Sequence, residues 1–179
     1  MTLTPINSGW IEVICGSMFS GKTEELMRRL RRAEIAKMNI EIFKPKIDSR
    51  FSSEHIVSHD RSKMESHIID DPKEILNISK DSEVIGIDET QFFKYSIVEV
   101  CKTLASEGKR VVVAGLDTDY RGLPFGPMPD IMCEADYLDK LRAICVKCGN
   151  PASYTQRTSS DLLQVVIGEH DKYEARCRN

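Results

Sequence analysis

The eight residues Gly16–Thr23, GSMFSGKT, constrain the fold of this chain more than any other segment. They match the pattern G-x-x-x-x-G-K-[ST], in which the backbone amides of a glycine-rich loop surround phosphate oxygens. The apolar residues 10–15 before the loop predict a buried strand. Residues 23–38 after it have apolar side chains at helical spacing, with Glu24 and Glu25 at the positive end of the helix. This order predicts an α/β fold built on a P-loop, although a glycine turn that only joins strand to helix is the alternative.

Further strands and helices alternate along the first 140 residues. We expect strands at 40–45, 82–89 and 109–117, and helices that begin near Pro72 and at Ser96. The polar, weakly periodic segment 47–67 predicts a mobile loop or a short hairpin. Alternating strands and helices indicate a mainly parallel sheet, of the RecA-like P-loop type, with helices on both faces.

The character of the sequence changes near residue 140, after which there is little helical periodicity and three of the six cysteines occur. We therefore predict two domains, a P-loop nucleotide-binding domain at 1–140 and a small zinc-binding domain at 141–179. The chain has 179 residues and a net charge of −3, which argues against a general nucleic-acid binder. No apolar run approaches the roughly 18 residues of a membrane span. A cytoplasmic protein without disulfides is the expectation.

Two acids follow the predicted strand at 82–89. Lys22 would reach the β- and γ-phosphates of a nucleotide, and the Thr23 hydroxyl would coordinate Mg²⁺. Asp88 fits the second metal-binding group that a P-loop protein needs at the end of a neighbouring strand, the alternative being a helix cap. Glu89 could then accept a proton from whatever attacks the γ-phosphate. If Glu89 activates water the protein is an ATPase, and if it activates a substrate hydroxyl the protein is a kinase.

The chain resembles the type II thymidine kinases, the cellular, zinc-containing family, in segments that run in order from residue 9 to 177. The matching segments are GSMFSGKTEELMRRLRR, FKPKIDSRFSS, SHDRSKM, VIGIDETQFF, VVVAGLDTDYRGLPFGPMP, CVKCGNPASYTQR and VIGEHDKYEARC. The resemblance implies transfer of the γ-phosphate of MgATP to the 5′-hydroxyl of thymidine, giving dTMP for DNA precursor salvage. The alternative is a P-loop ATPase whose zinc ribbon binds nucleic acid, which the acidic charge and the lack of a basic–aromatic stripe disfavour. A non-enzymatic zinc module would leave the phosphate-site residues unexplained.

The resemblance also implies roles for individual residues around the phosphates. Glu89 would be the general base, and Thr23 and Asp88 would hold Mg²⁺. Asp48 and Arg50 would lie near the transferred phosphate, although the residues alone allow a surface ion pair. The ATP site would comprise Gly16, Ser17, Met18, Phe19, Ser20, Gly21, Lys22, Thr23, Asp88, Glu89, Thr90 and Gln91.

The nucleoside site implied by the resemblance has aromatic walls and a flexible lasso. The walls would be Met18, Phe92, Leu116, Tyr120 and Phe125, which the residues alone would assign to the core. Some family members have Phe in place of Tyr120. The lasso would be Gln164, Val165, Val166, Ile167 and Gly168, ending with Tyr173, whose alternative is an ordinary core or surface tyrosine. Backbone groups in the lasso would pair with the thymine edge and reject other bases.

The spacing Cys145-x-x-Cys148, followed by Gly149, is typical of a zinc knuckle, the alternative being two buried thiols. The resemblance implies Cys177 as a third ligand and a fourth, Cys or His, one position beyond Asn179. The sequence offers His170 or a water as substitutes for the fourth. A structural zinc would tie the two ends of the lasso together. Cys15, Cys101 and Cys133 are expected in the core, and the resemblance implies a homotetramer inhibited by dTTP.

Overall fold

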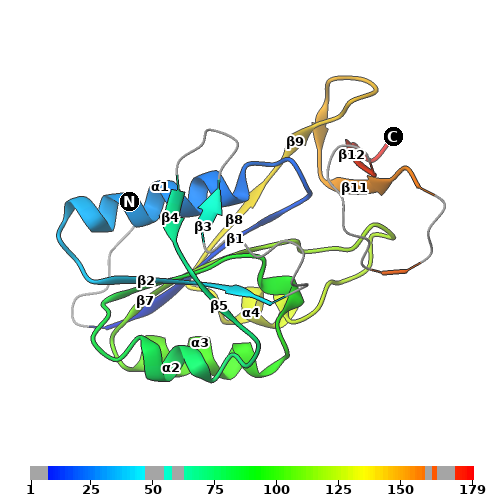
Figure 1. Ribbon diagram of the computed structural model, residues 1–179. Helices are drawn as coiled ribbons and strands as arrows, with labels where there is room; N and C mark the ends of the chain where they lie inside the picture. Colours follow the sequence, from blue (N-terminus) through cyan, green and yellow to red (C-terminus); the bar gives the residue numbers. More distant parts are fainter. Residues whose placement is uncertain (1–7, 47–54, 58–62, 160–162, 165–171) are drawn as a thin grey trace.

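The computed structural model describes residues 8–46, 55–57, 63–159, 163–164 and 172–179 (Figure 1). Its centre is a six-stranded sheet in the order β5-β2-β6-β7-β1-β8, and neighbouring strands pair in parallel throughout. The strands are β1 (Trp10–Gly16), β2 (Ile40–Pro45), β5 (His67–Ile69), β6 (Val84–Ile87), β7 (Arg110–Gly115) and β8 (Tyr137–Leu141). The predicted parallel α/β fold is therefore confirmed.

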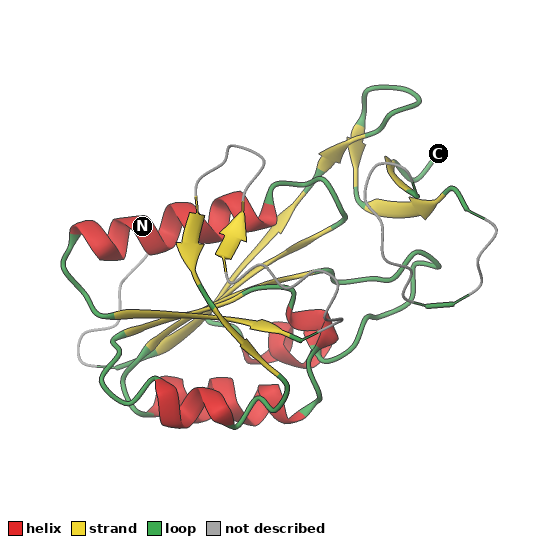
Figure 2. Cartoon of the chain, in the orientation of Figure 1, coloured by secondary structure: helices red, strands yellow, loops and turns green. Residues whose placement is uncertain are grey.

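Helices cover both faces of this sheet (Figure 2). Helix α1 (Lys22–Ile35) packs on one face against Ile14 of β1 and Val112 of β7. Helices α2 (Glu74–Ile78), α3 (Ser96–Ser106) and α4 (Met128–Glu134) cover the other face, toward which Val13 of β1 and Val113 of β7 point. The alternation of neighbouring residues between two apolar clusters follows from the two-residue period of a strand. Each buried strand therefore contributes to both halves of the core.

A buried carboxylate ties α1 to the sheet that it covers. Glu12 of β1 is 7% exposed and accepts hydrogen bonds from Arg110 at 2.6 Å and from Arg29 of α1 at 2.8 Å. Burial alone would raise the pKa of Glu12, but the hydrogen bonds from Arg110, Trp10 and Arg29 hold it below its usual value. Since α1 begins directly after the glycine-rich loop, this contact fixes the helix that carries the phosphate-binding motif.

The predicted strands at 40–45, 82–89 and 109–117 correspond to β2, β6 and β7. The segment 47–67 contains the antiparallel hairpin of β3 (His55–Val57) and β4 (Lys63–Glu65), which agrees with the predicted short hairpin. Edge strands β5 and β8 and helix α4 were not predicted. Both edge strands contain polar and charged residues, because an edge is open to solvent on one side.

The C-terminal residues form a small unit beside the end of the sheet that bears the glycine-rich loop (Figure 1). It has two two-stranded sheets, β9 (Ala143–Ile144) with β10 (Pro151–Ala152) and β11 (Tyr154–Arg157) with β12 (Tyr173–Arg176). Its core is a cluster of Ala143, Cys145, Ala152 and Ala175, against which Phe19 packs. A unit of fewer than about 40 residues needs a further source of stability, such as a metal. A domain boundary at residue 140 stays a prediction.

The three cysteines expected in the core differ from one another. Cys15 and Cys101 are buried, and burial raises the pKa of their thiols to about 11 and about 12, which makes them poor nucleophiles. Cys133 on α4 is exposed, so its assignment to the core was wrong. The buried face of helix α4 consists of Met128 and Ile131, and Cys133 lies on the other side of the helix.

Within the described ranges, no helix is long and apolar enough to cross a bilayer.

Candidate active site

The glycine-rich loop joins the end of β1 to the start of α1. Gly16 has φ +139°, and a Cβ there would lie 2.4 Å from the carbonyl oxygen of Leu141, so only glycine fits. Gly21 takes a left-handed conformation with φ +84° at the N-cap of α1. The Ser20 hydroxyl donates to the Ser17 carbonyl at 2.8 Å, closing the turn. The backbone conformation is thus that of a tight loop leading into a helix N-terminus, which favours phosphate.

The negative charges of three carboxylates act on the ammonium group of Lys22. Its Nζ donates to the Ser17 carbonyl at 2.7 Å, inside the loop. Burial lowers the pKa of Lys22, while the negative charges of Glu89, Asp88 and Asp117 oppose that shift. Asp117 itself forms a 2.5 Å ion pair with Lys140 of β8. The loop therefore carries a desolvated positive charge, which suits an anionic ligand such as the β- and γ-phosphates.

Asp88, which follows the carboxyl end of β6, contacts Thr23 in the first turn of α1. The Thr23 hydroxyl donates to Oδ2 of Asp88 at 3.1 Å, and the Glu89 amide donates to Oδ1 at 2.9 Å. Asp88 is 6% exposed, and burial, reinforced by the charge of Glu89, raises its pKa to about 7. A hydroxyl and a buried carboxylate side by side are oxygen ligands of the kind that Mg²⁺ prefers. The residues present therefore fit the metal.

Glu89 is held in an unusual backbone conformation by its neighbours. Its φ of +51° is left-handed, which is uncommon outside glycine and costs on the order of 1–3 kcal/mol. Gln91, which is buried, donates from Nε2 to Oε2 of Glu89 at 2.6 Å. Oε1 of Gln91 accepts from the Leu116 amide at 2.9 Å, which fixes the orientation of the amide group. The carboxylate is thus aimed by a buried side chain, and such strain is typical of functional sites.

Some of the residues expected around the nucleoside have contacts with segments distant in the sequence. Phe92, at the end of the short helix η2 (Thr90–Phe92), contacts Phe125 edge-to-face with ring centroids 5.4 Å apart. The Met18 amide donates to Oγ1 of Thr155 at 3.0 Å, which joins the glycine-rich loop to β11. The Tyr173 hydroxyl accepts a hydrogen bond from Arg157 at 2.8 Å.

Three cysteines of the C-terminal unit form a cluster with metal-ligand geometry. The sulfur atoms of Cys145, Cys148 and Cys177 lie within 4.8 Å of one another, the last two at 3.5 Å. Thiolates on a tetrahedral zinc ion are separated by about 3.8 Å. Backbone N–H groups of Cys177 and Lys147 lower the pKa of the Cys145 thiol to about 6, which favours the thiolate. Gly149, with φ +75°, makes the turn after the pair. The cluster fits zinc, with three ligands among the described residues.

Comparison with known proteins decides the family. A family model described as Thymidine kinase matches residues 9–179, nearly the whole chain. The chain belongs to the thymidine kinase family. A protein named Thymidine kinase from Rhodothermus sp. (strain ITI 518) is 54% identical over 170 residues, covering 95% of this chain and 80% of that protein. One of the same name from Bdellovibrio bacteriovorus is 54% identical over 171 residues, covering 95% and 84%. One from Bacteroides thetaiotaomicron is 53% identical over 170 residues.

Family membership confirms the predicted enzyme class, a kinase, over the ATPase alternative. Among solved structures, domain III of the Thermotoga maritima replication initiation protein DnaA aligns with a TM-score of 0.46 at 12% identity over 74% of this chain. That likeness is too weak to bear on function.

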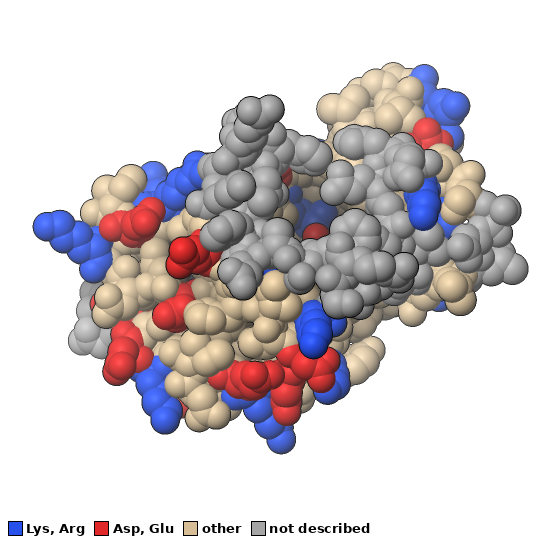
Figure 3. Space-filling view, viewed as in Figure 1, with Lys and Arg blue, Asp and Glu red and all other residues tan. Residues whose placement is uncertain are grey.

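The visible surface in Figure 3 mixes both signs of charge and has a hollow with acidic and basic atoms at its floor. The described residues on this face therefore form no basic stripe of the kind that binds nucleic acid.

The predicted site residues of the thymidine kinase family divide into those the structure brings together and those it does not describe. The phosphate loop, Asp88, Glu89, Gln91 and Leu116 are linked by the contacts above. Gln164 is exposed, and its Nε2 donates to Asp119 at 3.1 Å. The residues outside the described ranges are Asp48, Arg50, Val165, Val166, Ile167, Gly168 and His170. Thr155, Arg157, Asp117 and Asp119 lie at the site and were not predicted, because only contacts between distant segments reveal them.

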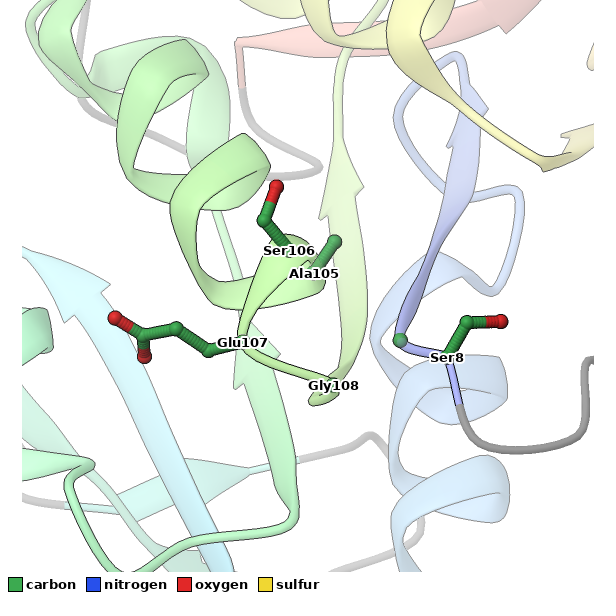
Figure 4. Close-up of a pocket in the computed structure, with 6 residues that line it drawn as sticks. Ser8, Ala105, Ser106, Glu107 and Gly108 are labelled. Carbon is green, nitrogen blue, oxygen red and sulfur yellow. The ribbon is translucent and has the colours of Figure 1, made fainter.

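A further hollow lies at the opposite end of the strands from the phosphate loop, next to the start of β1 (Figure 4). It is lined by Ser8, Gly9 and residues 105–108 at the end of α3. The side chain of Glu107 points away from Ser8. Residues 10–15 of β1 separate this hollow from the phosphate loop, about 20 Å along a strand. Apart from Glu107, its lining consists of small side chains and backbone.

Asp88→Asn is expected to be more stable than the natural chain above pH 7 when neither metal nor nucleotide is present. The folded state raises the pKa of Asp88 from 3.8 to about 7, so it binds the proton more tightly than the unfolded state does. Stability from this group is therefore present below about pH 4 and is lost as pH rises to 7. Since a pKa difference of one is worth about 1.4 kcal/mol, the advantage of the amide at pH 8 should exceed about 1 kcal/mol.

The measurement is urea unfolding with EDTA at pH 5 and pH 8. The exposed Asp130→Asn on α4 is the matched control and should follow the natural chain. If Asp88→Asn shows the same difference between the two pH values as the control, the buried carboxylate is not the cause of the pH dependence.

Proposed function

We propose that this chain transfers the γ-phosphate of ATP to the 5′-hydroxyl of thymidine, with Glu89 as general base. The observation that carries this proposal is the aimed carboxylate. Glu89 directly follows Asp88, is oriented by Gln91 at 2.6 Å, and contributes to the field at Lys22. A base adjacent to a metal-binding acid and facing the phosphate loop has the placement that proton removal from an attacking hydroxyl requires.

The phosphates would bind where the loop and Lys22 supply positive charge. Backbone amides of residues 16–23 and the start of α1 favour the phosphate oxygens, and the partly buried ammonium of Lys22 favours the charge that develops during transfer. Thr23 and Asp88 would hold Mg²⁺, which when bound neutralises charge on the β- and γ-oxygens. Each of these groups lies at the same end of the sheet, where the carboxyl ends of the parallel strands are found.

The chemical step would balance as a simple phosphoryl transfer. A bond forms between O5′ of the nucleoside and the γ-phosphorus, and the bond from that phosphorus to the bridging oxygen of ADP breaks. The proton of the 5′-hydroxyl passes to the Glu89 carboxylate. The products are ADP and the nucleoside monophosphate, dTMP when the substrate is thymidine.

The nucleoside would lie between the aromatic residues near β7 and the C-terminal unit. Phe92 and Phe125 would pack on the base, with Met18, Leu116, Tyr120 and Tyr173 as further walls. The lasso would recognise the thymine edge through backbone groups. Asp48 and Arg50 would assist near the transferred phosphate, and Thr90 would line the ATP site. On family membership alone, we also propose that the protein is cytoplasmic, forms a homotetramer and is inhibited by dTTP.

The test of this proposal is ADP release from MgATP with and without thymidine, beside parallel reactions with deoxycytidine, deoxyadenosine and deoxyguanosine. We expect release that depends strongly on thymidine and only weakly on the other three. Release at the same rate with every nucleoside and with none would mean that water is the acceptor, and it would overturn the proposal.

A further inference from the structure

Arg157, the last residue of β11, is a charged residue that is buried at the edge of the nucleoside site, with 6% of its surface exposed. Its guanidinium contacts neutral groups on two other segments. Nη1 donates to the carbonyl of Leu163, and Nη2 donates to the carbonyl of Gln164 at 2.9 Å and to the hydroxyl of Tyr173 at 2.8 Å. Burying a guanidinium is costly, so its contacts must be many and well placed to keep it there.

The guanidinium also lies against two tyrosine rings. Its central carbon is 3.7 Å from the ring centroid of Tyr120 and 5.2 Å from that of Tyr173. Both distances are within the range of a cation–π interaction, which is stronger when the charge is desolvated. Tyr120 comes from the loop after β7, and Tyr173 begins β12. One side chain therefore contacts two aromatic rings that come from distant parts of the sequence.

Asp119 supplies a second link between the same segments. Its Oδ1 accepts from the amides of Arg121 and Leu123, at 2.8 and 3.1 Å, which makes the loop rigid next to Tyr120. Its Oδ2 accepts from Nε2 of Gln164 at 3.1 Å. The loop after β7 and residues 163–164 are thus joined directly by Asp119 and also through Arg157.

We propose that Arg157 is a positioning residue for the nucleoside, which holds the rings of Tyr120 and Tyr173 at the separation that the base requires. The proposal rests on the proposed function, in which these rings are walls of the thymidine site. Arg157 is not part of the apolar core of the C-terminal unit, which consists of Ala143, Cys145, Ala152 and Ala175. Its role at the rings can therefore be tested apart from the stability of that core. The planar fork of arginine can stack and donate at once, which the lysine ammonium cannot reproduce.

The test compares Arg157→Met and Arg157→Lys with the natural chain. We expect Arg157→Met to raise the thymidine KM, and the thymidine Kd from calorimetry, by about tenfold or more. The ATP KM should stay unchanged and kcat should change by less than about threefold. Arg157→Lys should keep the charge but recover only part of the thymidine affinity. Arg176→Met, on the neighbouring strand β12 with an ion pair to Glu174, is the matched control and should leave the thymidine KM unchanged.

A double variant separates positioning from general stability. If Arg157 acts through the ring of Tyr120, the effects of Arg157→Met and Tyr120→Leu on thymidine Kd should be far from additive. Additive effects, equal rises in the KM values of thymidine and ATP, or a natural thymidine affinity in Arg157→Lys would each overturn the proposal. If Arg157→Met does not fold, the lysine variant alone decides. Failure of the proposed function can be told apart from failure of the Arg157 proposal, because in the first case the natural chain itself would show no dependence on thymidine.

Discussion

Replacing Glu89 with glutamine is expected to lower kcat by about 10²- to 10⁴-fold, the range that a positioned general base contributes. Glutamine has the size and shape of glutamate, and it can still accept the hydrogen bond that Gln91 donates at 2.6 Å. It cannot accept the proton of the 5′-hydroxyl. The phosphate loop and Lys22 are unchanged, so ATP binding by calorimetry should be retained. Steady-state kinetics with thymidine and MgATP give the measurement.

Glu99→Gln on α3 is the matched control, since Glu99 is exposed and forms an ion pair with Lys102. It should leave kcat unchanged, because exposed pairs contribute little. Full activity of Glu89→Gln would remove Glu89 as the base. Loss of ATP binding in the same variant would instead mean that Glu89 acts in the nucleotide site itself.

The phosphate site was predictable because its signals are local in the sequence. Gly16–Thr23 need only the strand before them and the helix after them, and Asp88 and Glu89 directly end an apolar strand. The left-handed conformation of Glu89 was not predictable, since φ > 0 at a glutamate runs against local preference. The side chain of Glu89 accepts from Gln91, whose amide is in turn held by Leu116, 25 residues further along the chain. Strain of this kind is visible only once distant segments are packed.

The nucleoside side was less predictable for the same physical reason. A tyrosine or phenylalanine in an apolar stretch has the same local signal whether it lies in the core or lines a site. Arg157 was missed because the residues that surround its charge are Tyr120, residues 163–164 and Tyr173. The cysteine cluster was half predictable. The spacing of Cys145 and Cys148 indicates a metal knuckle, whereas Cys177 lies 29 residues beyond and is joined to them only by the fold.

Cys148→Ser is expected to remove bound zinc and to raise the KM values of both thymidine and ATP, each by about tenfold or more. Zinc affinity contributes directly to folding in small units with a poor apolar core. That unit contacts the phosphate loop as well as the nucleoside site. Ser17 donates to the Ala152 carbonyl at 3.3 Å, and the Met18 amide donates to Thr155 at 3.0 Å. Loosening it should therefore disturb both substrates.

Zinc content by atomic absorption and thermal unfolding are the readouts that do not depend on activity. Cys133→Ser, an exposed cysteine on α4, is the matched control and should keep its zinc. Natural zinc content in Cys148→Ser would exclude this thiol as a ligand. Lost zinc with both KM values unchanged would mean that the unit does not support the phosphate loop.

The three classes of variant should separate because each acts on a different part of one site. Glu89→Gln should lower kcat with both substrates still bound, since only the proton acceptor is lost. Arg157→Met should weaken thymidine alone, because the guanidinium contacts rings and carbonyls on the nucleoside side. Cys148→Ser should weaken both substrates, because the C-terminal unit reaches the phosphate loop through Ser17 and Met18. If Cys148→Ser weakened thymidine alone, those two hydrogen bonds would not be what holds the loop in place.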